Sequence, residues 1–159
     1  MKRNSGLNQI KIIKKIEELE PPDKVINLIQ KQMTIIGGCS DFYHVKNALK
    51  NALRPESRSF LFLWYSESDE PGAFAFLNIC AGLETGSDYL WINELYVDNK
   101  NRKKNVASEM IRFIEKWSKD NKIKYIACTT GLGNEPAQKF YKKNNFDLHK
   151  TIWVDKNVK

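Results

Sequence analysis

The sequence predicts an α/β (α+β) fold, a central mixed and mostly antiparallel β-sheet with helices on both faces. Three observations predict it. Two helical stretches come early, three long apolar runs then follow one another too closely for helices between them, and the rest alternates between helical and strand-like periods. The helical stretches are 23–36, 41–53, 103–119 and 135–144, and the strand-like ones are 60–65, 73–80, 89–97, 124–129 and 146–154.

The size of the chain predicts one domain over residues 1–159 with a real core, because 42% of the residues are hydrophobic and 11% aromatic. The net charge of +7 suggests an anionic partner. It does not choose between a nucleotide, a nucleic acid and a membrane surface, and solubility alone also accounts for it.

Compartment and metal use are inferred from missing signals. Met1 to Gly6 carries no apolar run of signal-peptide or membrane-spanning length. The three cysteines (Cys39, Cys80 and Cys128) have no CxxC spacing, and the two histidines lie far apart. We therefore expect a cytoplasmic protein with no metal site and no membrane contact.

Helix start and stop signals define the first elements of the chain. Residues 10–20 alternate weakly, so a short edge strand and a helix are both possible, and the next two prolines end that element. Asp23 is a suitable N-cap for the first helix, which a glycine pair at 37–38 stops. Ser40 or Asp41 can cap the second helix.

The middle of the chain predicts a three-stranded antiparallel meander. A loop at 66–72, with Pro71-Gly72, and a turn at 84–88 separate the apolar runs. Apolar residues on both faces of these runs require helices on both sides of the sheet.

The C-terminal part returns to the helical period. The apolar face of the third helix is followed by the run at 124–129, which we expect to pair in parallel with the strand at 89–97. Asn134 caps the helix at 135–144, and a last strand is expected at 146–154.

Two motifs stand on these elements. A strand ending Leu95-Tyr96-Val97 leads to Arg102-Lys103-Lys104-Asn105-Val106-Ala107, which opens a helix. The second motif combines Asn134, Ala137, Phe140, Tyr141 and Phe146. Together, residues 89–146 resemble the GNAT superfamily of acetyl-CoA-dependent N-acetyltransferases.

The resemblance implies a site for acetyl-CoA. Backbone groups of Leu95 and Val97 would bind the pantetheine arm, and Asn134 would contact the cofactor. The pyrophosphate would lie on the helix N-terminus, whose free N–H groups and dipole suit an anion. The residues that would hold it are Arg102, Lys103, Lys104, Asn105, Val106, Ala107 and Ser108. The alternatives are a solvated basic loop or a nucleic-acid patch.

Asn105 departs from the family motif, which has glycine at this position. Asn tolerates left-handed backbone geometry better than other residues with a side chain, so we expect the turn to survive.

Two residues are candidates for proton transfer. The resemblance makes Tyr141 the acid that protonates the coenzyme A thiolate and Glu94 the base for the amine. Strand alternation puts Glu94 on one face with Ile92 and Tyr96, opposite Leu95 and Val97. Tyr141 can instead simply pack its helix onto the sheet, and Glu94 can reach solvent or Arg102.

The function implied is transfer of an acetyl group from acetyl-CoA to a primary amine, by direct attack in a ternary complex. The alternative is a non-catalytic acyl-CoA-binding or regulatory domain, which the departure at Asn105 favours. A nucleic-acid-binding module is disfavoured, because only charge points to it. The acceptor amine is not readable, and a monomer or homodimer is expected.

Overall fold

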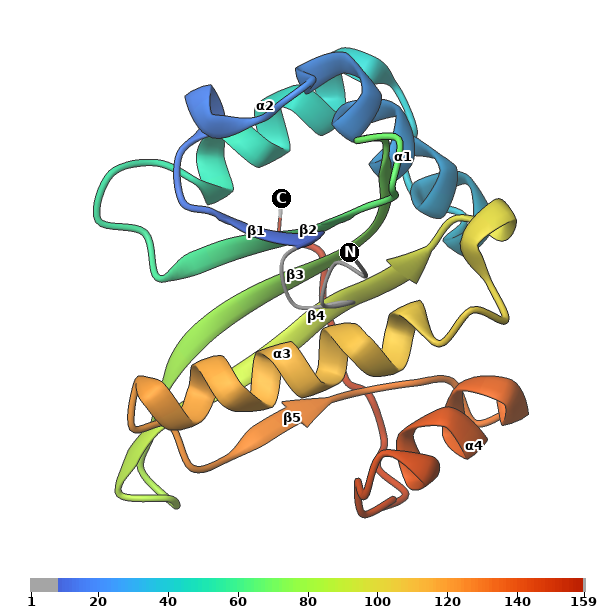
Figure 1. The fold of residues 1–159 in the computed structure, drawn as a ribbon. Helices are drawn as coiled ribbons and strands as arrows, with labels where there is room; N and C mark the ends of the chain where they lie inside the picture. Colours follow the sequence, from blue (N-terminus) through green and yellow to red (C-terminus); the bar gives the residue numbers. More distant parts are fainter. Residues whose placement is uncertain (1–8, 159) are drawn as a thin grey trace. The chain divides into compact units, whose positions relative to one another are not determined.

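The computed structural model describes residues 9–158, which form two compact units that meet in sequence between Cys128 and Thr129. The first unit contains a five-stranded sheet in the order β1-β2-β3-β4-β5 (Figure 1). Its elements are β1 (Ile10–Ile13), the 3-10 turn η2 (Ile16–Glu18), α1 (Pro22–Ile36), α2 (Phe42–Ala52), β2 (Ser59–Tyr65), β3 (Pro71–Gly82), β4 (Ser87–Val97), the 3-10 turn η3 (Asn99–Asn101), α3 (Val106–Asp120) and β5 (Ile126–Cys128).

The sheet confirms the predicted fold class. Strands β1 to β4 pair in antiparallel fashion, and β5 joins β4 in parallel. The open question at residues 10–20 is settled by the short edge strand β1, whose Ile10 pairs with Trp64.

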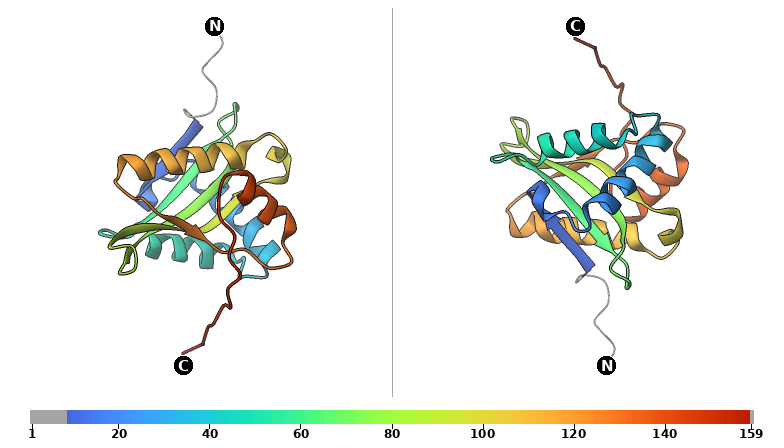
Figure 2. Two further views of the ribbon diagram at one scale, coloured as in Figure 1. Left: turned by 90° about the horizontal axis from the view of Figure 1, so that it is seen from below. Right: turned by 90° about the horizontal axis from the view of Figure 1, so that it is seen from above.

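Helices cover both faces of the sheet, as predicted (Figures 1 and 2). Because side chains alternate along a strand, those of β2 point in turn to the helices on one face of the sheet and to the helix on the other. Leu61 and Leu63 belong to the core that α1 and α2 close. Phe62 faces the other way, where its ring meets Phe113 and Trp117 of α3 at centroid distances of 5.5 and 5.4 Å.

The helix ends follow the expected chemistry, with one correction. The N-cap of α1 is Pro21 rather than Asp23, because Pro22 occupies the first turn, where its missing N–H costs nothing. Asp41 caps α2 and accepts a hydrogen bond from the His44 N–H at 2.9 Å. Gly37 ends α1 with φ of +75°. Of the helices in residues 9–158, none is long and apolar enough to cross a membrane.

The second unit contains α4 (Glu135–Lys143), and the predicted cap is confirmed: Asn134 Oδ1 accepts from the Ala137 N–H at 3.2 Å. The predicted strand at 146–154 is wrong. A strand needs a partner for its backbone groups, and this segment pairs with no strand in the described part of the chain. Its apolar residues Ile152, Trp153 and Val154 are largely exposed.

Gly72 allows the start of β3 to lie in close contact with η3, because it has no side chain. A Cβ at this position would overlap the side-chain amide of Asn101, which is buried, and would lie 2.9 Å from the Trp64 ring. We predict that Gly72→Ala lowers the free energy of unfolding by about 1–3 kcal/mol, as overpacking does in a filled core.

Urea denaturation measures this loss. Gly133→Ala is the matched control, because no atom lies within 4 Å of a Cβ there. Equal stability of the two variants would contradict the tight approach of Gly72 and Asn101.

Candidate active site

The second half of β4 has a partner on only one side. Pairing with β5 covers Leu90, Trp91 and Ile92 and then stops, whereas pairing with β3 continues to Val97. Within the described first unit, the edge of β4 beyond Ile92 that faces away from β3 therefore has no neighbouring strand. An open edge of this kind can bind an extended ligand through backbone hydrogen bonds.

A β-bulge at Asn93 marks the point where β4 changes. Ile92 pairs with Leu77 and Glu94 pairs with Phe76, so Asn93 is an extra residue on β4. Its side-chain amide donates to Asn78 Oδ1, whose own amide donates to Ser59 Oγ at 3.0 Å. These contacts hold the bulge on the face of the sheet that α1 and α2 cover.

The bulge corrects the predicted position of Glu94. Leu77 and Phe76 point to opposite faces, so their partners Ile92 and Glu94 do so too. Glu94 shares its face with Tyr96, as predicted, but not with Ile92. Simple alternation fails here because the extra residue shifts the period by one.

Glu94 is half-buried and accepts a hydrogen bond from Gln32 Nε2 of α1. Burial raises the pKa of the Glu94 carboxyl above its usual value, and the hydrogen bond from Gln32 partly opposes this rise. No ion pair with Arg102 forms within the described residues. A carboxyl with a raised pKa beside an open strand edge suits a general base.

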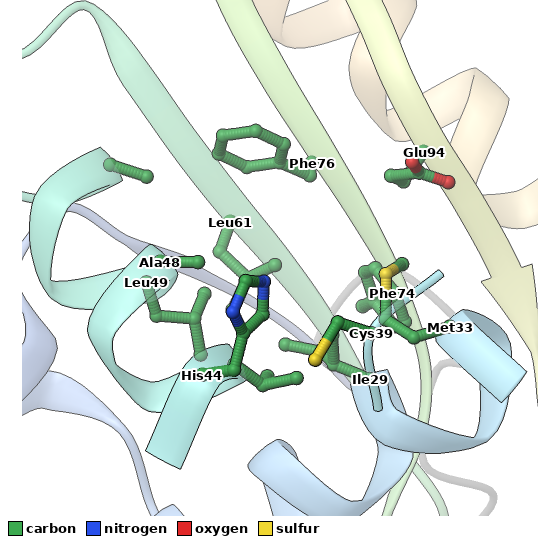
Figure 3. A pocket seen from close by; sticks show the side chains of 12 residues that line it. Ile29, Met33, Cys39, His44, Ala48, Leu49, Leu61, Phe74, Phe76 and Glu94 are labelled. Carbon is green, nitrogen blue, oxygen red and sulfur yellow. The ribbon is translucent and has the colours of Figure 1, made fainter. Parts of the chain in front are cut away.

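Glu94 lines a cavity of about 200 Å³ between the helices α1 and α2 and the sheet (Figure 3). The other lining residues are mainly apolar: Ile29, Met33, Cys39, His44, Val45, Ala48, Leu49, Ala52, Leu61, Phe74 and Phe76. In the close view, Glu94 and Phe76 lie on one side and the His44 ring on another. Cys39 and His44 are exposed, so the cavity reaches the surface at the connection between α1 and α2.

The basic turn between β4 and α3 is exposed from Arg102 to Asn105. Lys103 and Asn105 both have left-handed backbones, with φ of +59° and +62°. The expectation that Asn105 preserves the turn is therefore confirmed. Arg102 Nε donates to the Val97 carbonyl at 3.0 Å, which fastens the turn to the end of β4.

The N-terminus of α3 keeps its backbone donors available. The Asn105 side chain makes no capping hydrogen bond, and the first N–H bonded along the helix is that of Glu109, to the Asn105 carbonyl at 3.0 Å. The preceding N–H groups, from Val106 to Ser108, have no carbonyl one turn earlier in the helix. Together with the helix dipole and the exposed lysines, these groups suit a phosphate.

An ion pair joins α1 to the end of β4. Lys31 Nζ lies 2.5 Å from Asp98 Oδ2, and the Asp98 side chain is 10% exposed. Although burial alone would raise the pKa of Asp98, the hydrogen bond and charge of Lys31 hold it below its usual value. Neighbouring residues of α1, Lys31 and Gln32, thus contact both ends of the segment from Glu94 to Asp98.

Tyr141 and Asn134, the other predicted site residues, belong to the second unit. Tyr141 is buried, and its ring meets Phe140 and Phe146 at centroid distances of 5.2 and 5.3 Å. Asn134 has the capping role described above. Their roles toward a cofactor stay predictions.

Sequence reasoning missed Gln32, His44 and Asn93. Gln32 lies 62 positions from Glu94, so no local pattern links them. The polar Asn93 inside an apolar strand was an available signal for the bulge. Within residues 9–158, no group of three or more His, Cys, Asp or Glu residues is placed to hold a metal ion.

Comparison with known families gives the site its context. The model of the acetyltransferase (GNAT) family matches residues 22–146. The chain belongs to this family. The match includes both motifs, the cavity and the basic turn, and it supports acyl transfer as the general activity.

Solved structures share the fold at low sequence identity. A probable acetyltransferase superposes with a TM-score of 0.81 and 19% identity, covering 94% of this chain and 99% of that chain. A possible acetyltransferase from Clostridium difficile 630 gives 0.76 and 18%, with 94% and 98% covered. The aminoglycoside 6'-N-acetyltransferase AAC(6')-Ih from Acinetobacter baumannii gives 0.71 and 14%, with 94% and 99% covered. Curated proteins yielded no match.

The environment of Glu94 leads to a titration prediction. Carbon-13 NMR of the carboxyl should show a Glu94 pKa above that of an exposed glutamate, and Gln32→Leu should raise it further by removing the donor. The folded state then holds this proton more tightly than the unfolded state. The contribution of Glu94 to stability is therefore greatest below the unfolded pKa and falls as the pH rises through the folded pKa.

Gln30→Leu is the matched control, because the Gln30 amide donates to the Ser40 carbonyl and not to a carboxylate. A Glu94 pKa at or below that of exposed glutamates would contradict the buried environment.

Proposed function

We propose that the protein is an N-acetyltransferase that transfers the acetyl group of acetyl-CoA to a primary amine, by direct attack in a ternary complex. One observation carries the proposal. The open edge of β4 leads directly into a basic turn and an uncapped helix N-terminus, and Glu94 lies on the same strand. Family membership agrees with this assignment.

The first unit offers groups that fit coenzyme A. The backbone groups of Leu95 and Val97 would bond the pantetheine arm as a further strand does. The N–H groups from Lys103 to Ser108 would hold the pyrophosphate, with charge from Arg102 and Lys104. The Val97 carbonyl already accepts from Arg102, so Leu95 is the freer partner for the arm.

The chemistry needs one base and one acid. The amine nitrogen attacks the thioester carbonyl and forms the new C–N bond, and Glu94 takes the proton that the nitrogen loses. The C–S bond then breaks, and Tyr141 donates its phenolic proton to the thiolate. The products are an amide and free coenzyme A. The departure at Asn105 does not favour a non-catalytic domain, because Asn105 has the left-handed geometry required of the turn.

We also place the reaction in the cytoplasm, because the exposed free thiol of Cys39 suits a reducing compartment.

Cofactor binding tests the proposal directly. Calorimetry should show coenzyme A binding that weakens with salt, because exposed charges contribute to it. Lys103→Glu should weaken binding at least about tenfold, whereas Asn105→Gly should preserve or improve it, since glycine adopts the turn without strain.

Lys124→Glu is the matched charge control, because Lys124 is exposed and lies outside the turn. The absence of binding at millimolar coenzyme A would rule out the cofactor assignment.

Turnover variants test the proton transfers. Tyr141→Phe and Glu94→Gln should each keep coenzyme A affinity and reduce kcat by about 10²-fold or more. Coenzyme A release across a panel of amines measures this. Unchanged turnover in Tyr141→Phe would leave Tyr141 as a packing residue, and unchanged turnover in Glu94→Gln would remove Glu94 as the base.

A further inference from the structure

The cavity beside Glu94 has the chemistry of a binding site for one charged group on an apolar body. Among the described residues that line it, Glu94 is the only carboxylate and no Lys or Arg contributes. The rest of the lining comes mainly from aliphatic and aromatic side chains of α1, α2, β2 and β3 (Figure 3). The other polar lining groups are the Cys39 thiol and the His44 ring, both on exposed residues.

The volume of the cavity limits the size of the apolar part of the ligand. An apolar cavity of about 150 Å³ holds one benzene ring, and this cavity measures about 200 Å³. It therefore has room for one aromatic ring or a branched alkyl group of similar size. Burying such a group is favourable in proportion to its apolar area.

The single carboxylate limits the number of positive charges that the ligand can carry. One ammonium group can pair with Glu94, but each further ammonium would enter an apolar space without a partner, at a high cost in desolvation. Solved structures with this fold include aminoglycoside acetyltransferases, whose acceptors carry several amines. Beyond Glu94, the lining of the present cavity supplies no carboxylate that could pair with a second amine.

We infer that the acceptor is a monoamine on an apolar body about the size of one aromatic ring, with its ammonium on Glu94 and its body among Phe74, Phe76 and Leu61. The inference rests on the proposed function for the reaction, because Glu94 is the proposed base there. It specifies the class of acceptor and excludes polycationic ones.

Direct binding and turnover test it separately. Binding of phenethylamine to the full chain is measured by calorimetry with coenzyme A present, and 2-phenylethanol serves as a neutral isostere. Turnover is measured as coenzyme A release with phenethylamine, spermidine and kanamycin as acceptors. We expect phenethylamine to bind and to exceed spermidine and kanamycin in kcat/KM by at least about tenfold.

Two variants locate the binding. Ala48 of α2 lines the cavity but is exposed, so Ala48→Phe narrows the space without burying a larger group in the core. It should weaken phenethylamine binding at least about tenfold, whereas Ala81→Phe, the same change at an exposed strand end, should not. Glu94→Gln should weaken phenethylamine binding more than 2-phenylethanol binding, because only the amine carries charge.

The outcomes separate the two proposals. Phenethylamine binding that Ala48→Phe weakens supports the monoamine site, and absence of turnover with every amine tested then contradicts the proposed function alone. Acetylation of kanamycin without phenethylamine binding supports the proposed function and overturns this inference. Phenethylamine binding that Ala48→Phe leaves unchanged also overturns it.

Discussion

The candidate site depends on a change in the neighbours of β4. Over Leu90–Ile92 this strand has partners on both sides, and from Glu94 onward it pairs only with β3. Backbone N–H and C=O groups require hydrogen-bond partners, so an open strand edge is chemically distinctive. The Asn93 bulge lies at the transition, and a bulge bends its strand and increases the local twist. The basic turn and the N-terminus of α3 follow within a few residues.

The raised pKa of Glu94 follows from its burial at this transition in β4. A carboxylate within an apolar strand costs free energy unless it is paired, and Gln32 provides one hydrogen bond while the cavity leaves room for another partner. The carboxylate of Asp98, at the other end of this segment, is buried and is instead paired with Lys31. Their opposite pKa shifts follow from this difference, since only Asp98 has an adjacent cation.

Much of the fold could be predicted because its signals are local. Asp41 and Asn134 cap helices through contacts three residues away, Gly37 ends α1 through its own backbone, and Asn105 forms the turn for the same reason. The bulge, the hydrogen bond between Gln32 and Glu94 and the cavity depend on contacts between distant segments, which periodicity does not reveal. The strand expected at 146–154 failed for a related reason, because strand propensity produces a strand only where another edge accepts it.

The contacts of Lys31 and Gln32 give the two proposed binding sites one element in common, the helix α1. These adjacent residues join α1, which lines the cavity, to Asp98 and Glu94, which precede the basic turn. A ligand that displaces α1 must disturb an ion pair and a hydrogen bond at the base of that turn. Where a ligand at one site shifts α1, the affinity at the other site changes, and thermodynamic linkage makes that effect equal in both directions. A substitution in the cavity that moves α1 would accordingly change the dissociation constants of both proposed substrates, although it touches only one of them.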